Sequence, residues 1–294
     1  MMKNTRENHE QWTVKEENEL LKFLFERMAD RSKKSVRAIL ARGQVFVNDQ
    51  STSQFNEILK PGDIVAIRLD APNKKVSLRG VKILHEDADL IVIDKEAGLL
   101  SIATHNEKDR TAYHILSEYV KQAHPRNRIF VVHRLDRETS GVMVYAKNPK
   151  AQQILQNNWK RLVTERTYLA LVEGRVTENG TITSFLSEDN TLKMRSSQNA
   201  KHGKKATTHY TVFKTSRKQT LLKVNLDTGR KNQIRIHMQE LGHPIVGDKK
   251  YGATTHPFRR LGLHAHILAF THPITHQPLH FQSPVPPIFM TQFK

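Results

Sequence analysis

The 294-residue chain contains no cysteine, so it can form no disulfide, use no thiol nucleophile and bind no metal through thiolate ligands. Long apolar runs are also missing, and without a stretch of about 18 such residues a membrane-spanning helix is not expected. The opening residues, MMKNTRENHEQ, are polar and lack the apolar core of a secretion signal. Together these absences predict a cytoplasmic protein.

Acidic residues are scarce relative to basic ones: 29 Asp and Glu against 47 Lys and Arg give a formal net charge of +18. Because the excess is spread along the chain, it favours a polyanionic partner. Ribosomal proteins, nucleases and membrane-surface proteins share this property. No basic amphipathic helix with a Trp-rich apolar face supports membrane binding, so nucleic acid is the expected partner.

The N-terminal quarter predicts a small separate domain. Residues 1–15 are polar and predict a flexible arm. Between 16 and 70, two segments of helical period precede two strand-like segments, and Gly43 marks the end of the second helix. The outward face of that helix is basic, with Lys33, Lys34, Arg37 and Arg42. Residues 71–80 contain Pro, Asn and Lys but few apolar groups, which is typical of an interdomain linker.

The remainder, residues 81–294, is long enough for one larger domain. Its predicted strands come in runs, separated by helices over 111–121 and 150–162, rather than in regular alternation with helices. Such runs indicate an α+β fold with a mixed, largely antiparallel central sheet. Residues 189–206 are rich in Lys and Arg and poor in large apolar side chains, which predicts a mobile basic loop.

A polar run, HRLDRETSG, lies between two strand-like segments near the middle of the chain. In it Asp136 is flanked by Arg134 and Arg137. Neighbouring cations favour the ionised form of a carboxylate, which suits a nucleophile or a base rather than an acid. Taken alone, however, an Arg and an Asp this close in a loop form a surface ion pair more often than an active site.

Three motifs together resemble those of the RluA-type pseudouridine synthases. HRLDRETSG resembles the catalytic motif of that family, RTYLALVEG resembles the strand with its active-site tyrosine, and TGRKNQIRIHMQELGHPIVGDKKYG resembles the long motif with its active-site arginine. Taken singly, Tyr168 would be a core aromatic residue and Arg235 a helix-surface cation. The joint resemblance implies a pseudouridine synthase fold over 81–294, with Asp136, Tyr168 and Arg235 as catalytic residues.

The segment KKSVRAILARGQVFVND followed by LKPGDIV resembles a small RNA-binding module that ribosomal protein S-four shares with many RNA-modifying enzymes. This resemblance implies that the basic helix face contacts RNA phosphates, which orients the substrate without reading much sequence. It favours structured RNA of the large ribosomal subunit as the substrate, with transfer RNA as the alternative. A monomer is the default expectation.

The family resemblance also implies a mechanism. A uridine is flipped out of the RNA, its glycosidic bond breaks, and the uracil is rejoined to the sugar through carbon 5. Arg134 fills the vacated stack, Tyr168 stacks on the uracil, and Arg235 pairs with Asp136. The carboxylate of Asp136 either attacks the anomeric carbon or removes a neighbouring sugar proton, and the sequence leaves both roles open. The reaction is expected to need no cofactor and no metal.

Three positions depart from the usual family pattern: Arg166 replaces a common Lys, Asn232 replaces a common His, and Glu96 follows Lys95 where Pro is usual. We expect all three to be tolerated.

Two other classes of function compete. A non-catalytic RNA-binding or ribosome-assembly protein would share the charge but would not need the three catalytic residues. A metal-dependent nuclease is suggested by several C-terminal histidines, namely His264, His266, His272, His276 and His280. Because no carboxylate lies near them in the sequence, we expect no metal site there.

Overall fold

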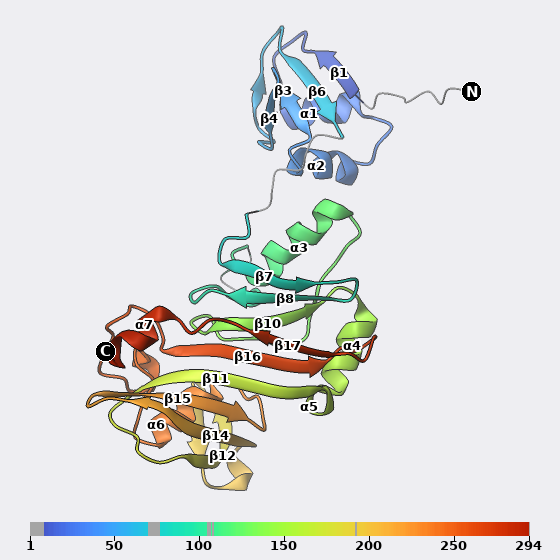
Figure 1. Cartoon of the computed structure of the whole chain (residues 1–294). Helices are drawn as coiled ribbons and strands as arrows, with labels where there is room; N and C mark the ends of the chain where they lie inside the picture. Colours follow the sequence, from blue (N-terminus) through green and yellow to red (C-terminus); the bar gives the residue numbers. More distant parts are fainter. Residues whose placement is uncertain (1–8, 70–76, 105–106, 108, 192, 294) are drawn as a thin grey trace. The chain divides into compact units, whose positions relative to one another are not determined.

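The computed structural model describes residues 9–69, 77–104, 107, 109–191 and 193–293. The chain divides into two compact units, with the boundary in the sequence between Ser77 and Leu78 (Figure 1). Most of the predicted linker over 71–80 lies outside the described residues. Among the helices that are described, none is long and apolar enough to cross a membrane.

The first unit contains two helices and short strands: β1 (His9–Thr13), β2 (Asn18–Glu19), α1 (Leu20–Arg27), α2 (Lys33–Ala41), β3 (Val45–Val47), β4 (Gln50–Thr52), β5 (Ile58–Leu59) and β6 (Ile64–Arg68). The strand order of its main sheet is β1-β6-β3-β4. As predicted, α2 is followed by Gly43 with a positive φ of 68°. Val36, Ile39 and Leu40 are buried and the lysines of α2 are exposed, so the amphipathic pattern correctly predicted the orientation of this helix.

The prediction of a flexible arm over 1–15 was wrong for the described part of that segment. Residues 9–13 form β1, which pairs antiparallel with β6 along its whole length. The reason is apolar burial at a sheet edge: Val14 is buried in the core of the unit and Trp12 packs against that core. These two side chains outweigh the polar composition around them.

The second unit holds the large sheet. Its elements are β7 (Val81–Glu86), β8 (Leu90–Lys95), α3 (Ala112–Ala123), β9 (Phe130–Val131), β10 (Ser140–Ala146), α4 (Pro149–Asn157), α5 (Trp159–Leu162), β11 (Val163–Glu173), β12 (Gly180–Glu188), β13 (Met194–Ser197), η1 (Ala200–His202), β14 (Lys204–Thr215), β15 (Gln219–Leu226), α6 (Gln233–Glu240), η2 (Lys249–Tyr251), β16 (Leu263–Thr271), β17 (Pro278–Gln282), α7 (Pro287–Met290) and η3 (Thr291–Phe293).

Within the described residues, these strands form an 11-stranded sheet of order β13-β12-β14-β15-β11-β16-β10-β8-β7, with β17 paired to β16 and β9 to β10. All pairings are antiparallel except that of β10 with β16. The predicted mixed, largely antiparallel α+β sheet is thus confirmed. The predicted helix over 150–162 is instead two helices, α4 and α5, which meet at Asn158.

The prediction of a mobile basic loop over 189–206 was also wrong. The segment contains β13, the short η1 turn and the start of β14, and β13 pairs with β12. Its few apolar side chains are well used, because Met194 and Ala206 are buried in one cluster with Leu186 and Tyr251. Because basic side chains lie between these buried positions in the sequence, the composition of the segment does not reveal them.

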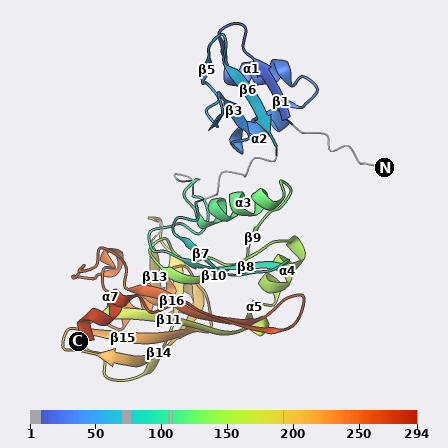
Figure 2. The ribbon, with the colours of Figure 1, turned by 45° about the horizontal axis from the view of Figure 1, so that its top comes forward.

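Strand alternation decides which side chains of β8 pack on the side of α3 and which on the side of α4. Ile91 and Ile93 of β8 pack in the cluster that contains α3, whereas Leu90 and Val92 pack in the cluster that contains α4. This is the two-residue period of a strand buried on both faces. Figure 2 shows α3 alongside β7 and β8, at one end of the large sheet.

The parallel contact between β10 and β16 is unusually close. Gly141, the last residue of the HRLDRETSG motif, pairs with Ala265 and has a φ of 113°. A Cβ atom at this position would collide with the backbone of Ala265. Glycine is therefore required here both for its backbone conformation and for space.

We predict that Gly141→Ala lowers the free energy of unfolding by about 3–5 kcal/mol, since it combines a strained φ with a backbone clash. Gly242→Ala is the matched control, because Gly242 also has a positive φ of 83° but faces open space. It should cost only about 1–2 kcal/mol, the price of the left-handed conformation alone. Urea denaturation of both variants measures the difference, and equal losses would show that the clash is relieved.

Candidate active site

A pocket of about 450 Å³ opens in the second unit, and the three predicted catalytic residues line it. Asp136 lies in the loop between β9 and β10, Tyr168 in β11, and Arg235 in α6. Arg134 lines the same pocket. The volume lies within the range of about 300–1,000 Å³ that is usual for small-molecule sites. The structure thus brings together residues that are far apart in the sequence.

The sheet register explains how Asp136 and Tyr168 come to line the same pocket. Tyr168 of β11 pairs with Ala265 of β16, and Ala265 in turn pairs with Gly141 of β10. Asp136 lies just upstream of this strand, in the loop that leads into β10. The close backbone approach at Gly141 therefore fixes the loop with the carboxylate one strand away from the tyrosine.

Arg235 is anchored by a carboxylate that the sequence did not identify. Its Nε and Nη2 donate to the two carboxylate oxygens of Asp248, at 2.7 and 2.8 Å. Its Nη1 lies 3.7 Å from Oδ2 of Asp136. Burial alone would lower the pKa of Arg235, but the bonds to Asp248 and the charges of Asp248 and Asp136 outweigh it and raise that pKa. The guanidinium is therefore held as a cation beside Asp136.

Asn232 completes the support of Arg235. It adopts the left-handed conformation, with φ of 55°, directly before α6, and Asn tolerates that conformation better than most residues. Its Oδ1 accepts a hydrogen bond from Nη1 of Arg235 at 3.3 Å, and its Nδ2 donates to the hydroxyl of Tyr251 at 3.0 Å. The ring of Tyr251 lies 4.9 Å from the guanidinium. Asn232, which stands where the family commonly has His, thus still links Arg235 to Tyr251 through hydrogen bonds.

Tyr168 lies on the face predicted from strand alternation. Ala170 and Val172 share its cluster, whereas Leu169 and Leu171 pack on the opposite face. Burial raises the pKa of Tyr168, with the charge of Asp136 adding to the effect and that of Arg166 opposing it. Its phenol therefore stays protonated and presents a flat aromatic ring to the pocket.

Lys95 holds the loop of Asp136 from behind. This lysine is fully buried, and its ammonium donates to the carbonyl oxygens of Glu96, Leu99 and Arg137 at 3.0, 2.7 and 3.1 Å. Burial lowers the pKa of Lys95 to about 8, although the charges of Glu138 and Asp136 act in the opposite direction. Because Arg137 follows Asp136 directly, the lysine fixes the backbone beside the carboxylate.

Sequence reasoning missed Asp248 and the role of Lys95. Both carried a signal: Asp248 stands in the apolar-flanked stretch HPIVGDKKYG, and Lys95 follows the buried strand LIVID. A charge in such a context needs a buried partner. Nothing in the sequence, however, identifies that partner.

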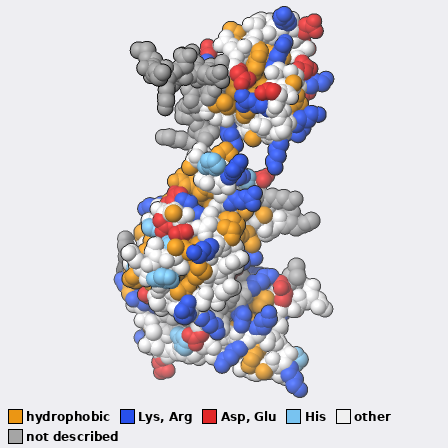
Figure 3. Space-filling model, turned by 90° about the vertical axis from the view of Figure 1, so that its right-hand side faces the viewer, with side chains coloured by type: hydrophobic (Ala, Val, Ile, Leu, Met, Phe, Trp, Pro, Cys, Tyr) orange, Lys and Arg blue, Asp and Glu red, His pale blue; other side chains and the backbone are white. Residues whose placement is uncertain are grey.

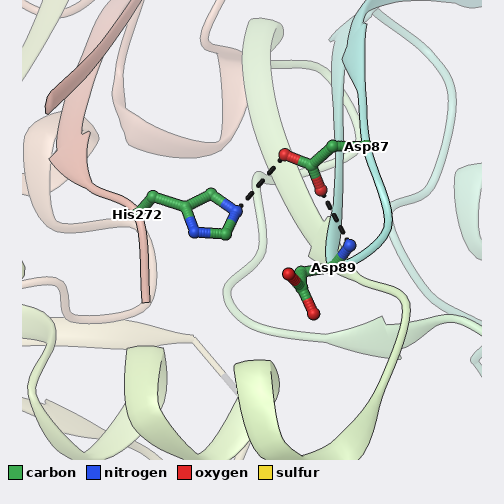
Figure 4. A group of neighbouring side chains, drawn as sticks. All are labelled: Asp87, Asp89 and His272. Carbon is green, nitrogen blue, oxygen red and sulfur yellow. Dashed lines mark hydrogen bonds and ion pairs between the residues drawn. The ribbon is translucent and has the colours of Figure 1, made fainter. Parts of the chain in front are cut away.

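No carboxylate lies near the C-terminal histidines in the sequence, but the fold brings two of them, Asp87 and Asp89, to His272. Its Nε2 lies 3.3 Å from Oδ2 of Asp87, with Asp89 beside them (Figure 4). Nδ1 of His272 accepts from the amides of Ile274 and Thr275, so the ring proton must be on Nε2, facing the carboxylate. Asp87 also accepts bonds from the amides of Asp89 and Leu90. These bonds tie two strand connections together and leave His272 no lone pair for a metal.

Comparisons with known proteins point to one family. Residues 89–240 match the family model described as RNA pseudouridylate synthase. The chain is 36% identical over 271 residues to the uncharacterized RNA pseudouridine synthase YhcT of Bacillus subtilis. This match covers 87% of this chain and 86% of that protein. It is 37% identical over 236 residues to the ribosomal large subunit pseudouridine synthase D of Xylella fastidiosa, with 75% and 70% covered.

A solved structure is similar as well. Human RNA pseudouridylate synthase domain containing 4 superposes with a TM-score of 0.59 at 25% identity, over 72% of this chain and 90% of that chain.

We predict that Asp248→Asn lowers the free energy of unfolding by about 2–4 kcal/mol, because it leaves the buried charge of Arg235 without its main partner. Glu118→Gln is the control, since it breaks the exposed pair with Lys121 and should cost at most about 1 kcal/mol. Urea denaturation at neutral pH measures both. Equal losses in the two variants would mean that the Arg235–Asp248 pair does not stabilise the fold.

Proposed function

The chain belongs to the RNA pseudouridine synthases, and from this membership we propose that it isomerises specific uridines of structured ribosomal RNA with Asp136 as its catalytic carboxylate. The observation that carries the proposal is the convergence of Asp136, Tyr168 and Arg235 on one pocket. A protein that only bound RNA would have no use for an ionisable carboxylate, a protonated phenol and an anchored guanidinium in one cavity.

The chemistry requires that the target base leave the RNA stack. The bond between uracil and ribose must break, and the base must turn before carbon 5 bonds to the same sugar. A stacked base has no room to turn, so the uridine is flipped into the pocket at a cost of a few kcal/mol. Tyr168 offers the flat surface on which the uracil rests, and the exposed Arg134 at the pocket is placed to fill the gap in the stack.

Arg235 supports the carboxylate in either of its possible roles. Attack on the anomeric carbon and removal of a sugar proton both use the ionised form of Asp136. A cation 3.7 Å away stabilises that form as the substrate displaces water from the pocket. Because Arg235 is already bound by Asp248, its position does not depend on the charge of Asp136 during the reaction.

The first unit is proposed to be the S-four-like RNA-binding module. Two cations of α2 lie near the ring of Phe25 in α1: Nζ of Lys33 at 5.7 Å from its centroid and the guanidinium of Arg37 at 5.3 Å. Lys34 is exposed on α2 and Arg42, half-buried, follows it. Such a surface suits phosphate contacts. Figure 3 shows Lys and Arg side chains on the visible face of both units.

Large-subunit ribosomal RNA is the proposed substrate. Several relatives, from Xylella fastidiosa and Vibrio cholerae among others, have the name ribosomal large subunit pseudouridine synthase D. The similarity covers 75% of this chain for the Xylella fastidiosa protein and 89% for the Vibrio cholerae protein, which supports the assignment. Transfer RNA is the alternative that the experiment distinguishes.

We predict that deletion of the gene removes pseudouridine from discrete positions of large-subunit ribosomal RNA. Wild-type protein should restore them, whereas Asp136→Asn should not, since an amide is neither a nucleophile nor a base. The measurement is pseudouridine mapping of total RNA, together with the affinity of both proteins for that RNA, which should be nearly equal. Loss of modification only in transfer RNA would reject the ribosomal assignment, and rescue by Asp136→Asn would reject the catalytic role.

We also predict that Lys33→Gln combined with Arg37→Gln weakens RNA binding and lowers the slope of log affinity against log salt by about 2, one per phosphate contact. Lys22→Gln combined with Lys60→Gln removes the same charge from exposed positions of the same unit outside α2. That control should change the slope little. Equal slopes for the two double variants would show that the α2 face makes no specific phosphate contacts.

A further inference from the structure

We infer that a second hollow beside the active pocket binds the nucleotide next to the target uridine in unpaired form, with its base against Trp159. This inference rests on the proposed function and names how its substrate is held. The hollow has a volume of about 560 Å³ and lies within the second unit. It is large enough for one nucleotide, given that small-molecule sites start at about 300 Å³.

The hollow and the active pocket share a wall. Five residues line both of them: Trp159, Arg166, Leu226, Gly229 and Arg230. The neighbour of a flipped uridine is bonded to it through one phosphodiester and must lie next to the pocket. The shared wall makes this hollow the adjoining space for such a neighbour.

The side chain of Arg166 lines both spaces. Nη2 of Arg166 donates to the carbonyl oxygen of Leu226 at 3.0 Å and so spans from β11 to the end of β15. Gly229 leaves room for it, because a Cβ atom there would lie 3.2 Å from Nη1 of Arg166. A guanidinium in this position can contact groups on either side of the wall.

The ring of Trp159 is held in place at the border. Its centroid lies 4.9 Å from the ring of His133 and 5.8 Å from the guanidinium of Arg166. Nε2 of His133 accepts a hydrogen bond from the amide of Val144, which fixes that ring in turn. Because Trp159 is only half-buried, it is available to the RNA. A fixed, partly exposed indole is the usual platform for an unpaired base.

The charges of the hollow favour a phosphate backbone. Lys160, Arg166 and Arg230 contribute three cations to its lining, against the two carboxylates of Glu165 and Asp227, which leaves a formal surplus of one positive charge. Both carboxylates are hydrogen-bonded, Glu165 by the hydroxyl of Thr167 at 2.7 Å and Asp227 by Nε2 of His209 at 2.9 Å. An aromatic ring beside surplus positive charge is the chemistry that binds single-stranded nucleic acid without strong sequence preference.

The fluorescence of Trp159 tests the inference directly. The chain has two tryptophans, so in a Trp12→Phe background only Trp159 emits. Two RNA probes with the same number of phosphates are compared: a ten-nucleotide oligouridylate, and the same strand with every second base removed. In the second probe each uridine has neighbours without bases.

The oligouridylate should quench Trp159. The alternating strand should bind about 5- to 150-fold more weakly, the worth of one base stacked on an aromatic ring, and should quench little. Equal quenching at saturation by both strands would overturn the inference, because Trp159 would then sense only the flipped uridine.

A charge reversal provides a second arm. Lys160 is exposed and lines the hollow but not the active pocket. Lys160→Glu should weaken binding of the oligouridylate more than Lys150→Glu, which makes the same change at an exposed position of α4 outside both spaces. Equal effects of the two variants would overturn the inference.

This experiment separates the inference from the proposed function, because quenching needs no turnover. Asp136→Asn in the Trp12→Phe background should keep the difference between the two probes. If the difference persists while mapping finds no modified uridine, the proposed function fails and the hollow remains an RNA site. If mapping succeeds and the two probes behave alike, the inference alone fails.

Discussion

The close contact of β10 and β16 at Gly141 is the constraint on which the site depends. Among the described strands of the large sheet, β10 and β16 form the one parallel pair, and this pair joins the two halves of the sheet. The row Gly141, Ala265, Tyr168 runs straight across it. A side chain at Gly141 would separate β10 from β16 and move the loop of Asp136 away from Tyr168. The glycine that ends the motif is therefore as much a part of the site as the aspartate within it.

Charge in the site is arranged in two layers. Asp248, which is buried, binds Arg235 through two short hydrogen bonds, while Asp136, which is partly exposed, lies farther from it. Lys95 supports the same loop from the interior through three carbonyl oxygens. Asp136 and Arg235 are thus positioned by buried groups behind them. Under the proposed function, the groups that contact the substrate would be held in place before it binds.

The sequence predicted those features that depend on local pattern. Alternation in RTYLALVEG gave the faces of β11 correctly, and the helical period around Val36 gave the buried face of α2. Prediction from sequence failed where a few buried apolar side chains order an otherwise polar segment, as Val14 does beside β1 and Met194 does in β13. It also failed for pairs such as Arg235 with Asp248 and His272 with Asp87, because a tertiary partner leaves no trace in the local pattern. Family resemblance supplied the proposed catalytic residues, which line one pocket, but not the residues that hold them.

The excess of positive charge and the shape of the site have separate consequences for RNA recognition. Phosphate contacts made by dispersed cations raise affinity for any RNA and carry little sequence information. If the pocket and the adjoining hollow bind as proposed, selectivity would come from their requirement that the target uridine and its neighbour both be unpaired. In a stacked duplex both bases must first be unpaired, which costs energy, whereas loops and bulges already present unpaired bases. Under the proposed function and the inferred role of the hollow, the enzyme would select its uridine by local RNA structure more than by the identity of the neighbouring bases.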